Sequence, residues 1–439
     1  MSFRGVQQGF LCCLLLLWGV RGLSASPAAT SCTTAPECVD PCQIDCPSPS
    51  WCEQPYLTGD WCGYRSSLAE SGIVFDLNVG QFYYGVTSGG LERTFEYAGH
   101  GDYVANADLG KLLGCQGLFL KLRAEHRFGQ SIGDAAGVLI APTIATDLPR
   151  PEDDNLYLTN VLFTQALSEN FAVFAGKTDT LDGDLNAFAH GRGMRQFSNF
   201  GLVANPVTLR TIPYSTLGAG FVILRELEPI FTFTVLNAKN TIDSDGFSEL
   251  FAEGVAIATE ARLPTTFFGL PGHQLFGGTW NSRDVVSLEQ SPGFLLPNVP
   301  IARASDSWSL YYNFDQYLVV DPQDPKRGWG VFGRAGIADQ NTNPLSAFLS
   351  AGVGGSSWLA NRARDTFGAG WFYVFTSEEI GPDLLPALGL VGDSQGVELF
   401  YNIEVTPWFH LTPDLQVLMP ARQNLDTALL VGLRGVVTF

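Results

Sequence analysis

Four charged side chains stand at every second residue of one short segment. Lys121, Arg123, Glu125 and Arg127 alternate with largely apolar residues in the run GLFLKLRAEHRF. Successive side chains of an extended strand point to opposite faces, so the four charges would share one face. Arginine supplies five fixed donors and stays protonated, while a carboxylate only accepts. Such a face can bind polar groups or pair with opposite charges.

The same alternation recurs in other short segments that Gly, Pro, Asn and Asp separate, which is typical of a meander of strands. The polar faces of these segments extend the set of candidate side chains. The full set of candidates for a polar, solute-facing surface is Lys121, Arg123, Glu125, Arg127, Asp76, Asn78, Tyr311, Asn313, Asp315, Tyr317, Arg334 and Arg434. We expect all of them to face the same side of a sheet as the first four charges.

The composition favours a membrane location for this sheet. The chain is 46% hydrophobic and only 16% charged, with a net charge of −19, whereas soluble domains carry about a quarter charged residues. No stretch reaches the eighteen apolar residues of a spanning helix. A transmembrane β-barrel fits both facts, because its apolar residues occupy every second position. The acidic charge argues against nucleic-acid binding.

We therefore predict an all-β fold, a transmembrane antiparallel β-barrel of about 16 strands, preceded by a short cysteine-rich N-terminal segment. Aromatic residues near strand ends, as in 82–84 and 371–373, are expected to form interfacial girdles. A β-sandwich also alternates polar and apolar faces, so the periodicity alone leaves the lipid-facing side open.

The N-terminal region divides into two parts before the barrel. Residues 1–25 have the layout of a secretory signal peptide, with Arg4, the apolar run FLCCLLLLW and then small residues. Residues 26–56 are rich in cysteine, and residues 57–439 form the predicted barrel. Disulfides are expected among Cys32, Cys38, Cys42, Cys46, Cys52 and Cys62. Their pairing stays open among 15 connectivities, and the lack of a CxxC pair or nearby His disfavours a metal site.

Several motifs resemble the OprB-type carbohydrate-selective porins. The segment LTGDWCGYRSSLAESGIVFDLNVGQFYYGVTSGG resembles the family's opening pattern, with Cys62 in place of a glycine. The resemblance continues in matching order through LFTQALSENFAVFAGKTDTLDGDLNAFAHGRGMRQFSN to ELFYNIEVTPWFHLTPDLQ and covers about residues 57–439. It implies an outer-membrane barrel of 16 strands that passes sugars by diffusion, with Phe439 matching the terminal aromatic read by the assembly machinery.

In such a barrel, the candidate residues would line a water-filled lumen and replace the hydrogen bonds that a sugar makes with water. Tyr311 and Tyr317 could stack on sugar rings. Alternatively, the charges at 121–127 only pair across the lumen, for example with Asp76 or Glu398. The segment 177–196 is acidic and Gly-rich, but it lacks the ligands of an EF-hand loop. We expect it to fold into the pore.

Other functions remain as alternatives. A general diffusion porin, or a structural barrel that attaches the cysteine-rich segment to another envelope component, would share these features. A barrel enzyme is not expected, because none of the five His residues lies in a recognisable catalytic motif. A soluble all-β sugar-binding protein is the remaining class. The expected partners are sugars, membrane lipid, the outer-membrane assembly machinery and, through the cysteine-rich segment, another envelope component, and no cofactor or metal is predicted.

Overall fold

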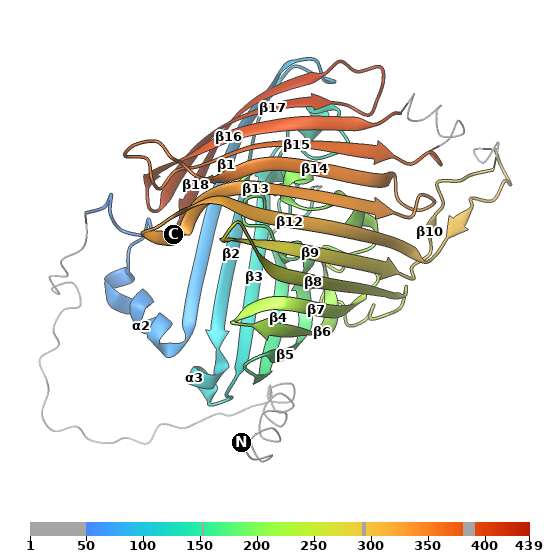
Figure 1. Cartoon of the computed structure of the whole chain (residues 1–439). Coiled ribbons are helices and arrows are strands. Elements are labelled where there is room, and N and C mark those ends of the chain that lie inside the picture. Colours follow the sequence, from blue (N-terminus) through green and yellow to red (C-terminus); the bar gives the residue numbers. More distant parts are fainter. Residues whose placement is uncertain (1–49, 152, 292–295, 381–390) are drawn as a thin grey trace, which may run out of the picture.

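The computed structural model describes residues 50–151, 153–291, 296–380 and 391–439. Within them, sixteen antiparallel strands close into one barrel, and β1 pairs with β18 to complete the ring (Figure 1). This confirms the predicted fold. The barrel strands are β1 (Ile73–Ser88), β2 (Phe95–Asp108), β3 (Leu118–Gly129), β4 (Tyr157–Ser168), β5 (Phe171–Asp179), β6 (Ser215–Arg225), β7 (Glu228–Asn237), β8 (Val255–Phe267), β9 (Leu270–Asn281), β12 (Ser307–Asp321), β13 (Asp324–Ala338), β14 (Leu345–Ser356), β15 (Thr366–Thr376), β16 (Ser394–Thr406), β17 (Phe409–Met419) and β18 (Ala428–Thr438).

Short elements lie in the connections between these strands. β10 (Val285–Val286) and β11 (Arg303–Ala304) form a separate two-stranded ribbon between β9 and β12. The helical turns are η2 (Trp61–Gly63), α2 (Tyr64–Ser71), α3 (Leu109–Leu113), α4 (Gly133–Ala136), η3 (Ile144–Asp147), η4 (Thr180–Asp182), α5 (Phe200–Val203) and η5 (Pro206–Arg210). No helix among the described residues has both the length and the apolar character needed to cross a membrane.

The two ends of the barrel differ in their connections. At one end, turns of two residues join β4 to β5, β6 to β7, β8 to β9, β12 to β13 and β16 to β17. At the other end, the connections 130–156, 180–214, 238–254 and 282–306 are long. We call these the short-turn end and the long-loop end. The segment before β1 and the C-terminus both lie at the short-turn end.

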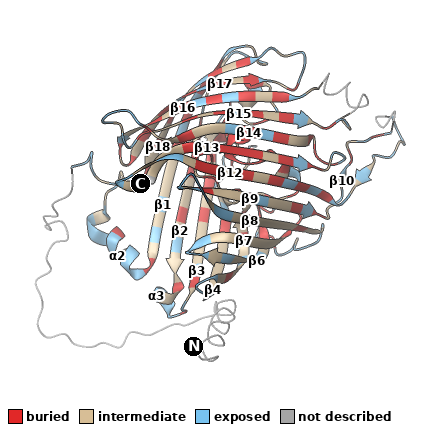
Figure 2. Ribbon diagram, viewed as in Figure 1, coloured by how far each residue is buried: buried red, intermediate tan, exposed pale blue. Residues whose placement is uncertain are grey.

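Side chains alternate between the lumen and the outer surface along each strand (Figure 2). On β1, Phe82 and Tyr84 are 2% exposed and point inward, whereas Tyr83 is 53% exposed on the outside. Phe372 on β15 is likewise buried inside. The expectation that residues 82–84 and 371–373 belong to outer aromatic girdles is therefore wrong for these inward rings. Adjacent residues of a strand face opposite sides, so three consecutive aromatic residues cannot all lie on the outer surface.

Glycines let the large inward side chains lie flat against the barrel wall. Gly277 on β9 pairs directly with Tyr311 on β12, and a Cβ at this position would lie 2.0 Å from the Tyr311 ring. Gly432 on β18 lies under Tyr84 in the same way, with a Cβ position 2.3 Å from that ring. Because each glycine has no Cβ, the aromatic ring of the paired residue can pack directly on its backbone.

The segment before β1 packs on the short-turn end and holds the last residue of the chain. Trp51 packs on Trp408 with 4.6 Å between ring centroids, and the Trp408 Nε1–H donates to the Trp51 carbonyl. Arg65 donates to the Phe439 carbonyl oxygen at 2.8 Å, with its guanidinium 3.5 Å from the centroid of the Tyr56 ring. This segment therefore ties the β1–β18 seam together.

Most of the N-terminal predictions lie outside the described residues. These are the signal peptide at 1–25 and four of the six cysteines expected in disulfides. Cys52 and Cys62 are described, and both are exposed without a bond to another described cysteine. The predicted disulfides and the boundaries 1–25, 26–56 and 57–439 stay predictions.

Replacing Arg65 by Ala should destabilise the closed barrel. The change removes a charged donor to the Phe439 carbonyl and the stacking on Tyr56, which together are worth about 2 kcal/mol or more. We expect the folded band in a gel to convert to the unfolded band at a lower temperature. Arg93→Ala, an exposed position in the β1–β2 loop, is the control. Equal conversion temperatures for both variants would contradict a role for Arg65 in holding the seam.

Candidate functional site

Two long connections fold back into the barrel from the long-loop end. We call residues 130–156 the first inward loop and residues 180–214 the second inward loop. Phe197 and Leu202 of the second loop are completely buried, and Phe197 packs edge-on against Phe332 and Phe400 of the wall, with ring centroids 5.3 Å and 4.9 Å away. The predicted folding of the segment 177–196 into the pore is confirmed. The two loops fill the lumen beside β1 and β12 to β18.

Arginines of the wall donate to the buried backbone of these loops. Arg334 on β13 has no exposed side-chain surface and pairs with Asp184 at 2.8 Å. It also donates to the carbonyl oxygens of Ala189 at 2.6 Å and Leu202 at 3.0 Å. Arg434 on β18 donates to Gly193 and Gln196 at 2.5 Å and 2.6 Å. Buried carbonyl groups need donors, and Arg supplies several in fixed directions.

Arg127 on β3 does the same for the first inward loop. It donates to the carbonyl oxygens of Thr146 and Pro151, each at 2.7 Å. Arg127, Arg334 and Arg434 were all predicted to face the lumen. They do so, but the inward loops cover them, and most of their donors are engaged with the protein itself.

The rest of the charged row on β3 joins a network with the second inward loop. Arg123 donates to Asp182 at 2.8 Å and to Asp102 at 3.0 Å, and Lys121 pairs with Asp182 at 2.5 Å. Arg192 of the second loop pairs with Glu125 at 3.0 Å and also contacts Asp179. The row therefore pairs with other charged residues, as one alternative proposed, but these lie on the same side of the barrel and on the loop rather than across the lumen.

The partners in this network differ from those suggested by the sequence. Asp76 accepts from Asn78 at 2.7 Å near the short-turn end. Glu398 accepts the backbone N–H groups of Ser198 and Asn199 at 2.6 Å and 2.9 Å. Neither reaches the charged row on β3. Asp102 comes from the neighbouring strand β2, Asp179 comes from β5, two strands away, and Asp182 and Arg192 come from the second inward loop.

Asp182 is the carboxylate on which this network converges. Burial would raise the pKa of its carboxyl, but the positive charges of Arg192, Arg123 and Lys121 outweigh burial and hold that pKa well below its usual range. Asp182 therefore stays ionised at neutral pH. About a third of its side chain, 36%, is still exposed to the lumen.

Most of the polar face of β12 is also covered. Asn313 donates to the Asp184 carboxylate at 2.7 Å, and Asp315 contacts Nδ1 of His273 at 2.8 Å. Tyr317 packs edge-on against Phe188 of the second inward loop, with centroids 4.7 Å apart. Tyr311 is also buried, at 8% exposed, and its hydroxyl donates to Glu260 at 2.7 Å, but this residue belongs to the lining of an open space.

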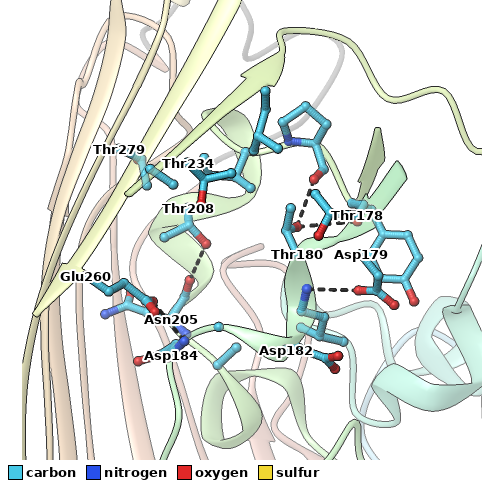
Figure 3. Close-up of a pocket in the computed structure, with 18 of the residues that line it drawn as sticks. Thr178, Asp179, Thr180, Asp182, Asp184, Asn205, Thr208, Thr234, Glu260 and Thr279 are labelled. Atoms are coloured by element: carbon cyan, nitrogen blue, oxygen red, sulfur yellow. Dashed lines mark hydrogen bonds between the residues drawn. The ribbon is translucent and has the colours of Figure 1, made fainter. Parts of the chain in front are cut away.

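That open space is a cavity of about 570 Å³ between the second inward loop and the inner faces of β5, β7, β8 and β9. Its lining includes Pro229 near one end of β7 and Leu236 near the other, so the cavity follows the wall over most of the strand's height. Figure 3 shows Thr234 and Thr279 on the wall and Thr180, Thr208 and Asp182 on the loop around this space.

About half of the residues that line the cavity are apolar, and the others are neutral polar residues and a few charged ones. Its hydroxyl and amide groups belong to Thr178, Thr180, Thr208, Thr232, Thr234, Thr259, Thr279, Ser307, Tyr214, Tyr311, Asn205, Asn240 and Asn281. Its charged residues are Asp179, Asp182, Asp184, Glu260, Arg210, Arg262 and Arg283. Of the twelve candidate side chains predicted from the sequence, the lining includes Tyr311 only. The sequence analysis missed the other lining residues. For those on β7, the available signal was the alternation of threonine with apolar residues in FTFTV, a segment without charged residues.

Comparison with known proteins gives one family. The carbohydrate-selective porin, OprB family, matches residues 92–439. The match begins after the segment 57–90, whose motif first suggested this resemblance. No curated protein sequence matches the chain.

Solved structures share the fold. A high-pH structure of Pseudomonas putida OprB has a TM-score of 0.77 at 19% identity, covering 89% of this chain and 100% of that chain. A low-pH structure of Pseudomonas putida OprB has a TM-score of 0.55 at 17% identity, covering 88% and 99%. At these identities the likeness shows the barrel architecture.

Replacing Arg334 by Met should release part of the second inward loop. The change leaves Asp184 without its ion-pair partner and several buried carbonyl groups without a donor, at a cost of about 3 to 5 kcal/mol. We expect proteases added from outside to cleave within 180–214, and we expect a larger, noisier ion conductance in planar bilayers.

Arg364→Met is the matched control for this experiment. Arg364 also forms an ion pair, with Glu404 at 3.0 Å, but its side chain is 73% exposed, so its loss should change neither measurement. A protease-resistant loop and an unchanged conductance in Arg334→Met would contradict the role of Arg334 in holding the loop.

Proposed function

Because the chain belongs to the OprB family of carbohydrate-selective porins, we propose that sugars cross through the cavity beside β5, β7, β8 and β9. The family and the sixteen-stranded barrel make the protein an outer-membrane porin for carbohydrates. The observation that carries the proposal is the position of the inward loops. They fill the lumen beside β1 and β12 to β18, and the cavity is the space they leave along the remaining wall.

The lining of the cavity suits an uncharged, strongly hydrated solute. A sugar gives up hydrogen bonds to water when it enters a narrow pore, and the pore must replace them without holding the sugar tightly. Threonine hydroxyls both donate and accept, and asparagine amides offer one acceptor and two donors. These groups are spread along the cavity, so a sugar can exchange partners step by step. This arrangement supports passive diffusion.

Tyr311 supplies an aromatic surface within the same passage. Its ring lies over Gly277 and its hydroxyl is held by Glu260, so the ring is fixed against the wall. Aromatic rings pack well on the apolar faces of sugar rings. We assign Tyr311 the role of a sugar contact, in keeping with its prediction from the sequence.

The charged row on β3 has a positioning role in this proposal. Arg123 and Glu125 hold the second inward loop through Asp182 and Arg192, and Arg127 holds the first. Because the loops set the boundary of the cavity, these residues control its width. Arg334 acts on the second loop from the opposite wall, and Arg434 acts on it from β18.

Two further partners are proposed for the short-turn end. Phe439 is the candidate signal for the assembly machinery, as terminal aromatic residues are in other outer-membrane barrels. The cysteine-rich segment is the candidate attachment to another envelope component. The packing of Trp51 on Trp408 supports this second proposal, because it holds the last residues of the cysteine-rich segment at the end that faces the periplasm in bacterial barrels.

Replacing Thr234 by Trp should reduce sugar uptake. Thr234 faces the cavity from β7, and an indole there would fill part of the passage. We expect slower swelling of sugar-loaded liposomes and a smaller single-channel conductance. Val235→Trp puts the same side chain on the lipid face of the same strand and is the control.

Three outcomes would contradict the position of the passage, the transport function or the selectivity for sugars. Equal swelling rates for Thr234→Trp and Val235→Trp would place the passage elsewhere. A correctly folded protein without any conductance would end the transport proposal. Size-matched non-sugars that permeate as fast as glucose would indicate a general diffusion porin.

A further inference from the structure

Carboxylates face the cavity at mid-height, and the cations that pair with them lie behind. The Asp182 side chain is 36% exposed, whereas its partners Arg123 and Arg192 are only 9% and 5% exposed. Its third partner, Lys121, is 32% exposed. Asp182 lines the cavity, and none of the three cations does. A solute in the passage therefore meets the negative side of this ion cluster first.

The cluster also holds more carboxylates than arginine and lysine side chains. The carboxylates of Asp102, Glu125, Asp179 and Asp182 share the cations of Lys121, Arg123 and Arg192, and Glu125 also lies 3.4 Å from Nε2 of His100. In the neighbouring pair, Asp184 is matched by Arg334. Asp182 is the carboxylate of this cluster that faces the cavity, since it belongs to the lining and is 36% exposed, whereas the Asp179 side chain has no exposed surface.

Glu260 adds a second negative charge across from the loop. It accepts from the Tyr311 hydroxyl at 2.7 Å and from the backbone N–H of Asp184 at 2.9 Å. Among the described residues, no ion pair joins Glu260 to a cation. Its carboxylate comes close to the loop at Gly183, where a Cβ would lie 3.2 Å from Glu260 Oε1. Asp182 and Glu260 thus stand on either side of Gly183.

The positive groups of the lining are mostly neutralised by partners of their own. Arg262 lies 3.6 Å from Glu228, and Arg283 pairs with Glu253 at 2.7 Å. Arg210 is exposed, and it is the last residue of η5 in the second inward loop. The middle of the passage, between Asp182 and Glu260, is therefore negative.

We propose that this passage selects its sugars by charge, admitting neutral and amino sugars and slowing anionic sugars such as uronates and sugar phosphates. The proposal rests on the assignment of the cavity as the sugar passage. Acidic side chains lining a narrow pore favour cations, and like charges brought together at close range repel strongly. Asp182 and Glu260 are the residues that set this preference.

The test combines electrical and uptake measurements on the full-length protein. In planar bilayers with asymmetric KCl at low ionic strength, where surface charges are screened least, we expect a reversal potential of the sign that indicates K⁺ preference. In liposomes, glucuronate should enter at least about threefold more slowly than glucose, and glucosamine should enter no more slowly than glucose.

Two variants identify the residues. Glu260→Gln keeps an oxygen that can accept from Tyr311 and Asp184, and Asp182→Asn keeps the size of the side chain. Each should move the reversal potential toward zero and speed glucuronate entry relative to glucose. Glu169→Gln removes the same charge from an exposed position in the β4–β5 turn and should change neither quantity.

The outcomes distinguish this inference from the proposed function. A channel that conducts and passes glucose but prefers Cl⁻, or passes glucuronate as fast as glucose, overturns the charge selection and leaves the sugar passage standing. Unchanged selectivity in both Glu260→Gln and Asp182→Asn removes these two residues from the mechanism. A folded barrel without conductance overturns both proposals.

Discussion

The structure depends on satisfying backbone that is buried inside a barrel. The two inward loops have little regular structure, and their carbonyl groups lie away from bulk water. Arg127, Arg334 and Arg434 reach these carbonyls from three different strands. Without such donors, each buried carbonyl would lose its hydrogen bonds to water and gain nothing in return. The position of the loops, and with it the shape of the lumen, follows from this requirement.

Ion pairs determine where the loops bind on the wall more than they add to the stability of the fold. Buried ion pairs lose most of their Coulomb energy to desolvation, and their removal is costly mainly because one partner is left alone. Arg192 has carboxylates on both β3 and β5 as partners, so its loop fits in one place on the wall. The same carboxylates then shape the potential in the cavity, so that one network serves both the fold and the passage of solutes.

The sequence predicted the fold better than the site. Alternation and composition were sufficient for the strands, because both are local properties, but they did not show that Phe82, Tyr84 and Phe372 face inward. The site depends on what an inward side chain meets, and Arg334 meets Ala189, 145 residues away in the chain. No local pattern contains that information. The cavity wall was missed for a related reason, since Thr232 and Thr234 are inconspicuous until the loops have filled the opposite side.

The contact between Arg65 and Phe439 joins residues 374 positions apart. Contacts this distant in sequence form late, because the chain between them must first be ordered. The first strand of the barrel can pair with the last one only when the whole cylinder is complete. The N-terminal segment therefore gains its final binding place only at closure, and its docking marks a finished barrel.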